Sequence, residues 1–360
     1  MLAEVGERGS LRDIQVMIAS VPSHRWLRRF AWLLASLTLL LICSGGMVTS
    51  KGVGLAVPDW PTTFGYNMFL FPISQWVGGV FFEHTHRLIA STIGLLTIVL
   101  TVWLWRAESR RWLRWLGVAA LGAVVLQGVL GGLRVTMLKD EIGIFHACLA
   151  QAFFGLLVFI ALASSKSWEM RENQSAAPRT VWLAIAATML IYLQLALGAT
   201  MRHQHRDLSI LDFPAAYGQL IPDVSAEKLP AVNRWREARA LSEVTAGQIW
   251  LQMAHRFVAL LIGTAVLAYW VSVRQSRAHA AKSLQRLSTL WVFLLACQVT
   301  LGAWTIWSNK AADVATAHVA VGATMLGFGV AISALTLRSA RAIEPMAVVR
   351  RSAVVQGVHA

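Results

Sequence analysis

The chain has 360 residues, of which 56% are hydrophobic and only 14% are charged. Soluble domains carry roughly 25% charged residues, so this composition excludes an ordinary cytosolic protein. The formal charge of +14 would suit a nucleic-acid-binding protein if the basic residues formed one face, but they occur in short clusters between long uncharged stretches. The three cysteines lie in apolar runs and form no Cys-x-x-Cys motif. We therefore expect no nucleic-acid partner and no disulfide framework.

Eight stretches are long and apolar enough to cross a membrane core, which takes roughly 20 helical residues. They predict an all-α membrane protein with eight transmembrane helices in contact with membrane lipid. The first stretch follows 29 polar and mixed-charge residues and lacks a cleavage site, so it is expected to remain as an anchor. In chain order, the expected spans are 30–48, 80–105, 116–133, 142–163, 181–201, 249–273, 290–307 and 314–337.

Basic residues orient these spans, because short cytoplasmic loops carry an excess of Lys and Arg. The N-terminus, the even-numbered loops and the C-terminus hold 20 of the 32 Lys and Arg residues, whereas the three short loops on the other side hold four. Both termini are therefore predicted to be cytoplasmic, in a multi-pass protein of the cell's inner membrane. The expected parts are a cytoplasmic segment 1–29, a first half 30–163, a cytoplasmic linker 164–180, a second half 181–337 with a long outer loop 202–248, and a cytoplasmic tail 338–360.

The sequence also repeats internally. Residues 45–65 align without a gap with residues 198–218, and the His86-Arg87 segment aligns with the His255-Arg256 segment. Each unit has four spans, an even number, so both copies are expected to cross the membrane in the same direction. The predicted architecture is two parallel-repeated four-helix bundles.

Four histidines occupy matching places in the two units: His86, His146, His255 and His318. Each lies in the opening turns of an even-numbered span, near the outer face, where ionisable residues are rare and costly. Pairing His86 with His146 and His255 with His318 would place an imidazole on each side of a haem iron inside a bundle. The alternative is that they are interhelical or interfacial hydrogen-bonding residues. Repetition in pairs favours haem, and two histidines per half fall short of a zinc site.

The two units differ at one acidic position. Glu83 precedes His86 by three residues and so shares its helix face, whereas the matching residue in the second unit is Gln252. A carboxylate beside a haem ligand can stabilise developing positive charge or relay protons, which suggests that only the first pocket does chemistry. Arg87 and Arg256 directly follow their histidines, and we expect them either to pair with haem propionates or to extend to the membrane interface.

Three other histidines carry weaker signals. His84 is turned roughly 200° from His86 around the helix, so it cannot face the same pocket and is expected in a groove or at the lipid interface. His203 and His205 are expected to be solvated residues of the long outer loop, with no assigned role.

These residues together resemble the haem A synthase family. The resemblance rests on Glu-x-x-His-Arg at 83–87, the outer-loop sequence 54–61 ending in Asp-Trp-Pro, the second His-Arg pair at 255–256, and the histidines of the fourth and eighth spans. It covers roughly residues 30 to 337. One departure is that Val57 and Thr63 stand where some members carry a cysteine pair, so a thiol-disulfide role of this loop is absent.

The resemblance implies a function, which is oxidation of a methyl group of haem O to the formyl of haem A for terminal oxidases. It also implies a haem b cofactor on His255 and His318 with Arg256 beside it, and substrate haem bound through its iron by His86 and His146 with Arg87. Glu83, His86 and His146 are the implied catalytic residues. Further implied partners are an electron donor or acceptor of unidentified kind, haem O synthase and terminal oxidase assembly.

Two other functions compete with this interpretation. A di-haem b electron carrier would hold permanent haem in both pockets and do no chemistry on it, but such a carrier has no evident use for Glu83. A transporter is disfavoured by the parallel repeat and by the scarcity of charges at the membrane midplane.

Overall fold

The computed structural model describes residues 25–165, 168, 177–204, 208–275 and 281–341. All regular elements within these residues are helical. Eight of the helices are long and apolar enough to cross a membrane. They are α2 (Arg25–Ser50), α3 (Gly78–Ala107), α4 (Arg111–Met137), α5 (Asp140–Ala163), α7 (Pro178–Gln204), α9 (Ala246–Gln275), α10 (Ala281–Trp307) and α11 (Ala312–Arg341).

The eight predicted spans are confirmed as helices, and each helix continues beyond the apolar stretch that predicted it. The largest extension is in α10, which begins at Ala281 rather than at residue 290. Helical hydrogen bonds join backbone atoms and therefore persist past the last apolar side chain. At the far end of α7, the same extension moves Arg202 and His203 from the expected loop into the last turn of the helix.

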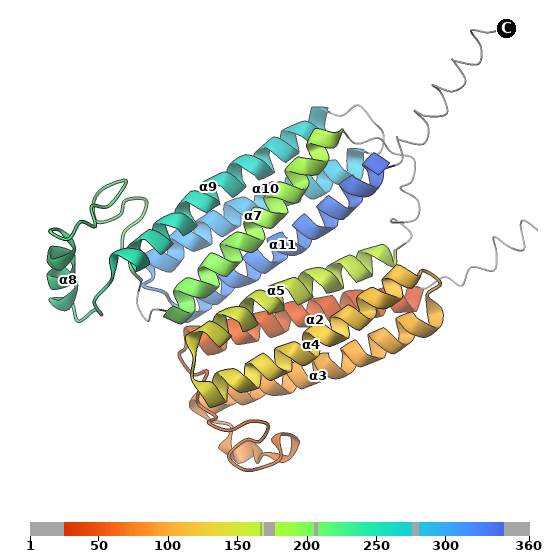
Figure 1. Cartoon of the computed structure of the whole chain (residues 1–360), viewed down its shortest axis with the longest axis horizontal. Helices are drawn as coiled ribbons and strands as arrows, with labels where there is room; N and C mark the ends of the chain where they lie inside the picture. Colours follow the sequence, from red (N-terminus) through yellow and green to blue (C-terminus); the bar gives the residue numbers. More distant parts are fainter. Residues whose placement is uncertain (1–24, 166–167, 169–176, 205–207, 276–280, 342–360) are drawn as a thin grey trace, which may run out of the picture.

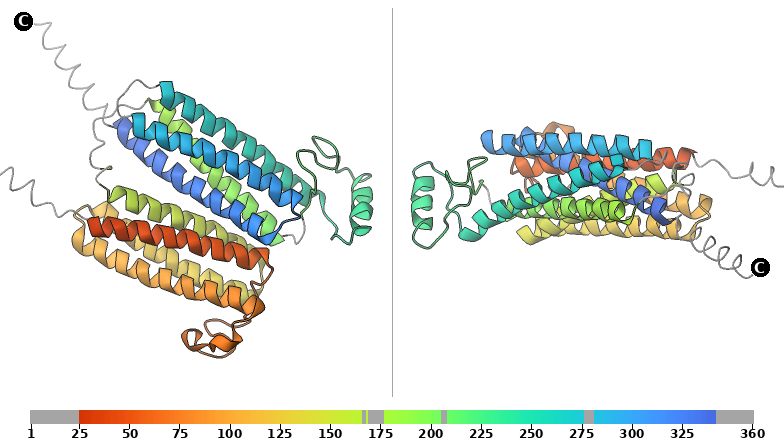
Figure 2. Two further views of the ribbon diagram at one scale, coloured as in Figure 1. Left: turned by 180° about the vertical axis from the view of Figure 1, so that it is seen from behind. Right: turned by 90° about the horizontal axis from the view of Figure 1, so that it is seen from above.

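The long helices pack in two groups (Figure 1). In the first, α2 contacts α3, α3 contacts α4, α4 contacts α5, and α5 returns to α2. In the second, α7 contacts α9, α9 contacts α10, α10 contacts α11, and α11 returns to α7. The two groups lie side by side in the left view of Figure 2, with α5 and α2 on one side of the junction and α7 and α11 on the other.

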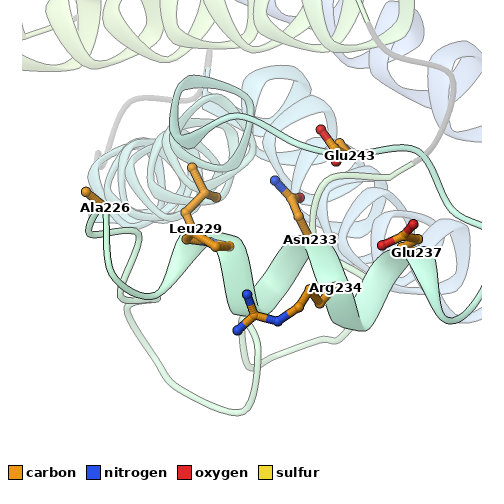
Figure 3. Close-up of a pocket in the computed structure, with 7 residues that line it drawn as sticks. Ala226, Leu229, Asn233, Arg234, Glu237 and Glu243 are labelled. Atoms are coloured by element: carbon orange, nitrogen blue, oxygen red, sulfur yellow. The ribbon is translucent and has the colours of Figure 1, made fainter.

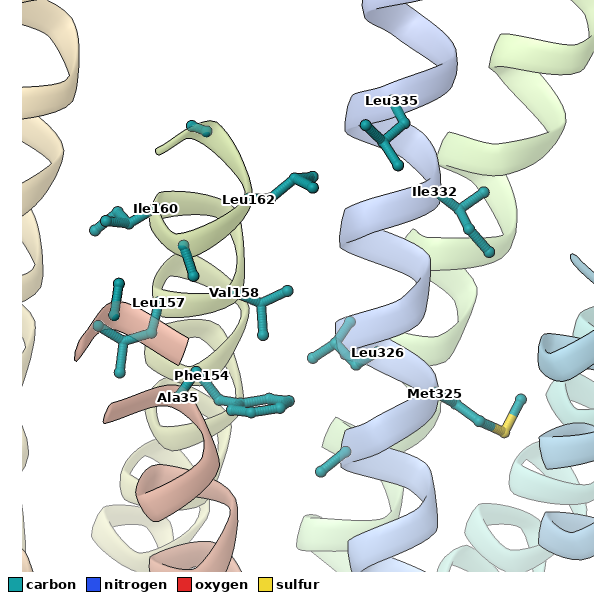
Figure 4. Packing of buried hydrophobic residues seen from close by; sticks show 14 of the residues in the cluster. Ala35, Phe154, Leu157, Val158, Ile160, Leu162, Met325, Leu326, Ile332 and Leu335 are labelled. Atoms are coloured by element: carbon teal, nitrogen blue, oxygen red, sulfur yellow. The ribbon is translucent and has the colours of Figure 1, made fainter. Parts of the chain in front are cut away.

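Apolar and small side chains fill the junction between the two groups. Val158 of α5 faces Leu326 of α11 across it (Figure 4). A Cβ atom on Gly327 would lie 3.0 Å from Cε1 of Phe154, so the glycine allows this ring to lie directly on the α11 backbone. Close approach of this kind at small residues is how helices associate in membranes, where apolar burial alone provides little driving force.

The two long connections, after α2 and after α7, lie at the same end of the helices, and the final turn of α11 lies at the other end (Figure 1). The first connection contains the short 3-10 helices η1 (Met68–Leu70) and η2 (Ile73–Gln75), and the second contains α8 (Leu229–Glu237). Sequence analysis did not predict α8, because its nine residues are polar and too short to show an apolar period. Helices α3, α5, α9 and α11 all begin at the end of the bundles that carries the long connections. Their histidines, in the first turns, therefore lie at the same end of the molecule.

Candidate functional site

Each of the four repeated histidines packs its ring against a glycine of a neighbouring helix. A Cβ atom on Gly45 of α2 would lie 3.0 Å from Cε1 of His86, and one on Gly302 of α10 would lie 3.1 Å from Cε1 of His318. The same relation joins Gly131 of α4 to His146 at 3.4 Å and Gly198 of α7 to His255 at 3.5 Å. The missing side chains leave room for the imidazoles between the helices, so these four glycines position the rings.

The structure brings the histidines together in the expected pairs. His86 interacts electrostatically with His146, and His255 with His318. In every case the ring Nδ1 is buried without a hydrogen-bond partner among the described residues. Buried polar atoms are nearly always paired in native proteins, so four unpaired imidazole nitrogens at equivalent places indicate a site that a bound group completes.

Glutamines lie beside three of the histidines. Gln127 donates its Nε2 hydrogen to the backbone carbonyl of His146 at 3.0 Å, and Gln194 donates to that of His255 at 2.9 Å. Gln298 Nε2 lies 3.5 Å from Nε2 of His318. The Oε1 atom of each glutamine is buried and unpaired among the described residues. Gln127 and Gln298 occupy matching places in the internal repeat, whereas the position that matches Gln194 holds Leu41.

Glu83 and Arg87 fasten the first long connection to α3. The Glu83 carboxylate accepts the Val57 N–H at 2.9 Å and pairs with Arg87 at 2.7 Å, with both side chains almost fully buried. Arg87 in turn donates to the carbonyl oxygens of Val57, Asp59 and Thr62 at 2.7–3.1 Å. Both polar atoms of the Val57 peptide group facing α3 are thereby satisfied.

Gln252 and Arg256 attach the second connection to α9. Gln252 alone makes two bonds to Ile210, whereas Glu83 and Arg87 together make the two equivalent bonds to Val57. Gln252 accepts the Ile210 N–H at 2.9 Å and donates to the carbonyl of the same residue at 3.0 Å. Arg256 donates to the carbonyls of Asp212 and Ala215 at 2.6 and 2.8 Å. Apart from the bond between Arg87 and Glu83, the hydrogen bonds shown for the guanidinium groups of Arg87 and Arg256 go to loop carbonyls, a role that sequence analysis did not predict.

A partly exposed carboxylate also organises the turn in each connection. Asp59 accepts hydrogen bonds from the Phe64 and Gly65 N–H groups at 2.7 and 2.9 Å and from the Thr62 hydroxyl, and Asp212 accepts two equivalent N–H bonds at 2.8 Å each. Partial burial alone would raise the pKa of Asp59, but these hydrogen bonds outweigh it and hold the pKa below its ordinary value.

Two of the remaining histidines lie elsewhere than expected. His84 is fully buried, with Nδ1 3.2 Å from the Thr63 hydroxyl and its ring against Phe71 and Trp76, so the expectation of a lipid-facing or groove position is wrong. The aromatic residues of the connection fold over the helix end and cover it. His203 is partly buried in α7 and packs on Gly143 at the start of α5, rather than standing in a solvated loop. His205 lies outside the described residues.

The cavity drawn in Figure 3 is separate from the histidine pairs. It has a volume of about 360 Å³ and lies against α8, where Leu229, Asn233, Arg234 and Glu237 line it. None of the four paired histidines lines it, and its walls come only from the second connection.

The donor set fits haem. Among the described residues, no three His, Cys, Asp or Glu side chains converge on one point, so the paired imidazoles are the available ligands. Two imidazoles on facing helices of a bundle suit an iron already held in four positions by a porphyrin. The buried unpaired nitrogens and the glycine contacts repeat in both halves, which provides two such places.

The fold and these residues define a class, namely a polytopic membrane protein with two groups of four helices, each of which contains a pair of histidines with buried Nδ1 atoms. Residues 66–330 match the COX15-CtaA family of cytochrome oxidase assembly proteins, and the chain belongs to this family.

Similar proteins include three bacterial haem A synthases. That of Shouchella clausii is 28% identical over 278 residues, which cover 74% of this chain and 90% of that protein. That of Geobacillus kaustophilus is 24% identical over 339 residues, 89% of this chain and 94% of that protein. That of Rhodopseudomonas palustris is 27% identical over 349 residues, 86% and 90% respectively.

Proposed function

We propose that this protein is a haem A synthase, which oxidises a methyl group of haem O to the formyl group of haem A for terminal oxidases. The observation that carries the proposal is the pair of equivalent histidine sites. These sites occur in a chain that aligns with haem A synthases along most of their length. The proposal includes supply of the substrate by haem O synthase and use of the product in terminal oxidase assembly.

The two sites have different roles in this proposal. His255 and His318 hold a permanent haem b, with Arg256 close by, and His86 and His146 hold the iron of the substrate haem, with Arg87 close by. Haem b supplies a one-electron redox centre when bound. The glycine contacts fix the four imidazoles before any ligand arrives, which lowers the entropic cost of binding.

Glu83 is the proposed catalytic acid-base residue of the first site. If water supplies the oxygen, converting a methyl group into a formyl group releases four protons and four electrons, so the reaction needs a proton path and an electron acceptor of unidentified kind. Glu83 lies one helical turn from His86 and is the ionisable carboxylate that α3 places at this depth. Its ion pair with Arg87 at 2.7 Å fixes the position of the carboxylate, which in this proposal stabilises positive charge or passes a proton outward.

One structural observation favours the di-haem electron carrier as a second candidate. Glu83 and Arg87 clamp the Val57 peptide group just as Gln252 alone clamps that of Ile210. The acid therefore has a structural use, which a carrier would also need.

The experiment that separates the two functions analyses haems extracted from cells. The full chain is co-expressed with a haem O synthase in cells that make no haem A of their own. Haem A should appear, and His86→Ala should abolish it while the haem b signal remains; His255→Ala should instead remove the bound haem b. Cells that hold loaded protein with haem O as the only modified haem would overturn the proposal.

The same proposal places the chain in the cell membrane with both ends of the polypeptide in the cytoplasm. The basic residues at the end of the bundles away from the long connections support this, among them Arg106, Arg111, Arg274 and Arg338. The histidine sites would then lie near the outer face.

A further inference from the structure

Two arginines at the loop end of the bundles have no role in the sites described so far. Arg134 lies in the last turn of α4, three residues beyond Gly131, which holds His146, and Arg202 lies in the last turn of α7, four residues beyond Gly198, which holds His255. At a rise of 1.5 Å per residue, the backbone of each arginine lies about 4.5–6 Å nearer the outer face than the glycine that contacts the histidine. The two arginines are not repeats of each other, because the matching positions hold Thr305 and Thr49.

Arg202 reaches across the junction of the two bundles. Its Nη2 donates to the carbonyl of Gly46 at 2.8 Å and to the hydroxyl of Ser50 at 2.5 Å, both in α2. Ser50 in turn lies 3.4 Å from the Thr316 hydroxyl of α11. Only one guanidinium nitrogen makes these bonds, and the residue is partly buried. Among the described residues, no hydrogen bond is shown for the other two guanidinium nitrogens.

Packing against the first connection, rather than hydrogen bonds, positions the Arg134 side chain. A Cβ atom on Gly54 would lie 2.8 Å from Arg134 Nη2, so the first connection passes directly over the guanidinium group. Among the described residues, Arg134 makes no hydrogen bond or ion pair. Its nearest acids act only through space: Glu83, which is already paired with Arg87, and Asp140, which is exposed at the start of α5.

The positive charges lie close enough to repel one another. Arg134 interacts electrostatically with Arg202 and with His203, and Arg202 also interacts with His203. Placing two guanidinium groups together at a membrane edge is unfavourable unless an anion joins them. Arginine suits a carboxylate especially well, since its planar fork can bind both oxygens.

The same electrostatic interactions tie each arginine to one histidine site. Arg134 interacts with His86 and His146, and Arg202 interacts with His318. A haem held by either histidine pair carries two propionate carboxylates along one edge of its porphyrin. Arg134 and Arg202 lie on the outer side of both sites, whereas the hydrogen bonds shown for Arg87 and Arg256 go to loop carbonyls and, for Arg87, also to Glu83.

We propose that Arg134 binds a carboxylate of the substrate haem in the first site and that Arg202 binds a carboxylate of the haem in the second, so that both porphyrins are oriented with their propionates toward the bundle junction at the outer face. This inference rests on the proposed function, because it needs haem in the histidine pairs. Arg134 is then a positioning residue, because it sets which edge of the porphyrin faces away from the methyl group that is oxidised.

The test compares haem O with its dimethyl ester, in which both carboxylates are blocked. Full-length protein purified in detergent from cells lacking haem O synthase is titrated with each probe, and the bis-histidine absorbance of the first site reports binding. The wild type should bind haem O roughly 10- to 100-fold more tightly than the ester, the effect of a charge-assisted hydrogen bond. Arg134→Met should remove this preference, and Arg134→Lys should keep part of it.

Lys139→Met provides the matched control, because Lys139 is an exposed cation between α4 and α5 at the same end of the molecule. It should preserve the preference for the free acid. For the second site, Arg202→Met should shift the midpoint potential of the resident haem to more negative values, because a cation next to a haem carboxylate favours the reduced iron; Lys139→Met should leave it unchanged.

The outcomes separate this inference from the proposed function. Equal wild-type affinity for haem O and its ester, with normal bis-histidine spectra for both, would overturn the carboxylate site alone; a lipid phosphate on Arg134 would give this result. An Arg134→Met variant that still prefers the free acid would overturn it as well. No bis-histidine spectrum with either probe would instead refute the haem site itself.

Discussion

Substituting Glu83 by glutamine tests whether the first site carries out chemistry. The structure indicates that the fold survives this change. Gln252, at the matching place, accepts the Ile210 N–H at 2.9 Å, so a glutamine at position 83 can accept the Val57 N–H in the same way. Both axial histidine pairs stay intact, and haem binding should persist.

The charge on residue 83 is what the substitution removes. Arg87 loses its 2.7 Å bond to the carboxylate but keeps three loop carbonyls. A hydrogen bond to a charged group is worth about 1.5–3 kcal/mol, which lowers the Tm of a protein but leaves it folded. Removing a preorganised catalytic group costs more in rate, about 3–4 kcal/mol, and should slow haem A formation roughly 10²- to 10³-fold.

The assay measures haem A and its precursors, per mole of bound haem b, in cells co-expressing haem O synthase. Glu83→Gln should accumulate haem O or a partly oxidised haem. Gln252→Glu is the matched control, since it disturbs the second loop clamp equally and leaves the first site unchanged, so its haem A yield should stay near wild type. Wild-type haem A in Glu83→Gln, with no precursor, would show that the carboxylate serves only to hold the loop.

Three further predictions follow from particular contacts. Gly302→Ala places a methyl group 3.1 Å from His318 and should weaken the low-spin haem b spectrum, whereas Gly263→Ala, with open space around it, should not; equal spectra would refute the role of the glycine contact. Folding lowers the pKa of Asp59, so the stabilisation from its carboxylate is complete above the unfolded-state pKa of about 3.9 and is lost as the pH falls through the folded-state pKa. The Tm of wild type should therefore exceed that of Asp59→Asn by less below about pH 4 than above it. A difference in Tm that does not change with pH would contradict this. In right-side-out vesicles, an impermeant maleimide should label Ser225→Cys and miss Ser109→Cys, both exposed in the structure, and the reverse pattern would invert the topology.

The sequence by itself determined the eight spans and the four histidines. A membrane span must satisfy its own backbone hydrogen bonds, so an apolar run of sufficient length has little choice but a helix. The histidines were recognisable because an internal repeat gives each residue a second copy to be compared with, as His86 has in His255. Position within a span then fixed their common depth, which required only the helical rise per residue.

The tertiary structure alone decided what surrounds those histidines. That Gly45 faces His86, that Gln194 reaches the backbone of His255, and that Arg134 and Arg202 approach one another depend on how separate helices are rotated and packed. No local period encodes such contacts, because they join residues far apart in the chain. Glu83 shows the limit most clearly: the sequence identified it as the acid beside a ligand, but only folding the first connection onto α3 revealed the Val57 N–H and Arg87 that it also holds.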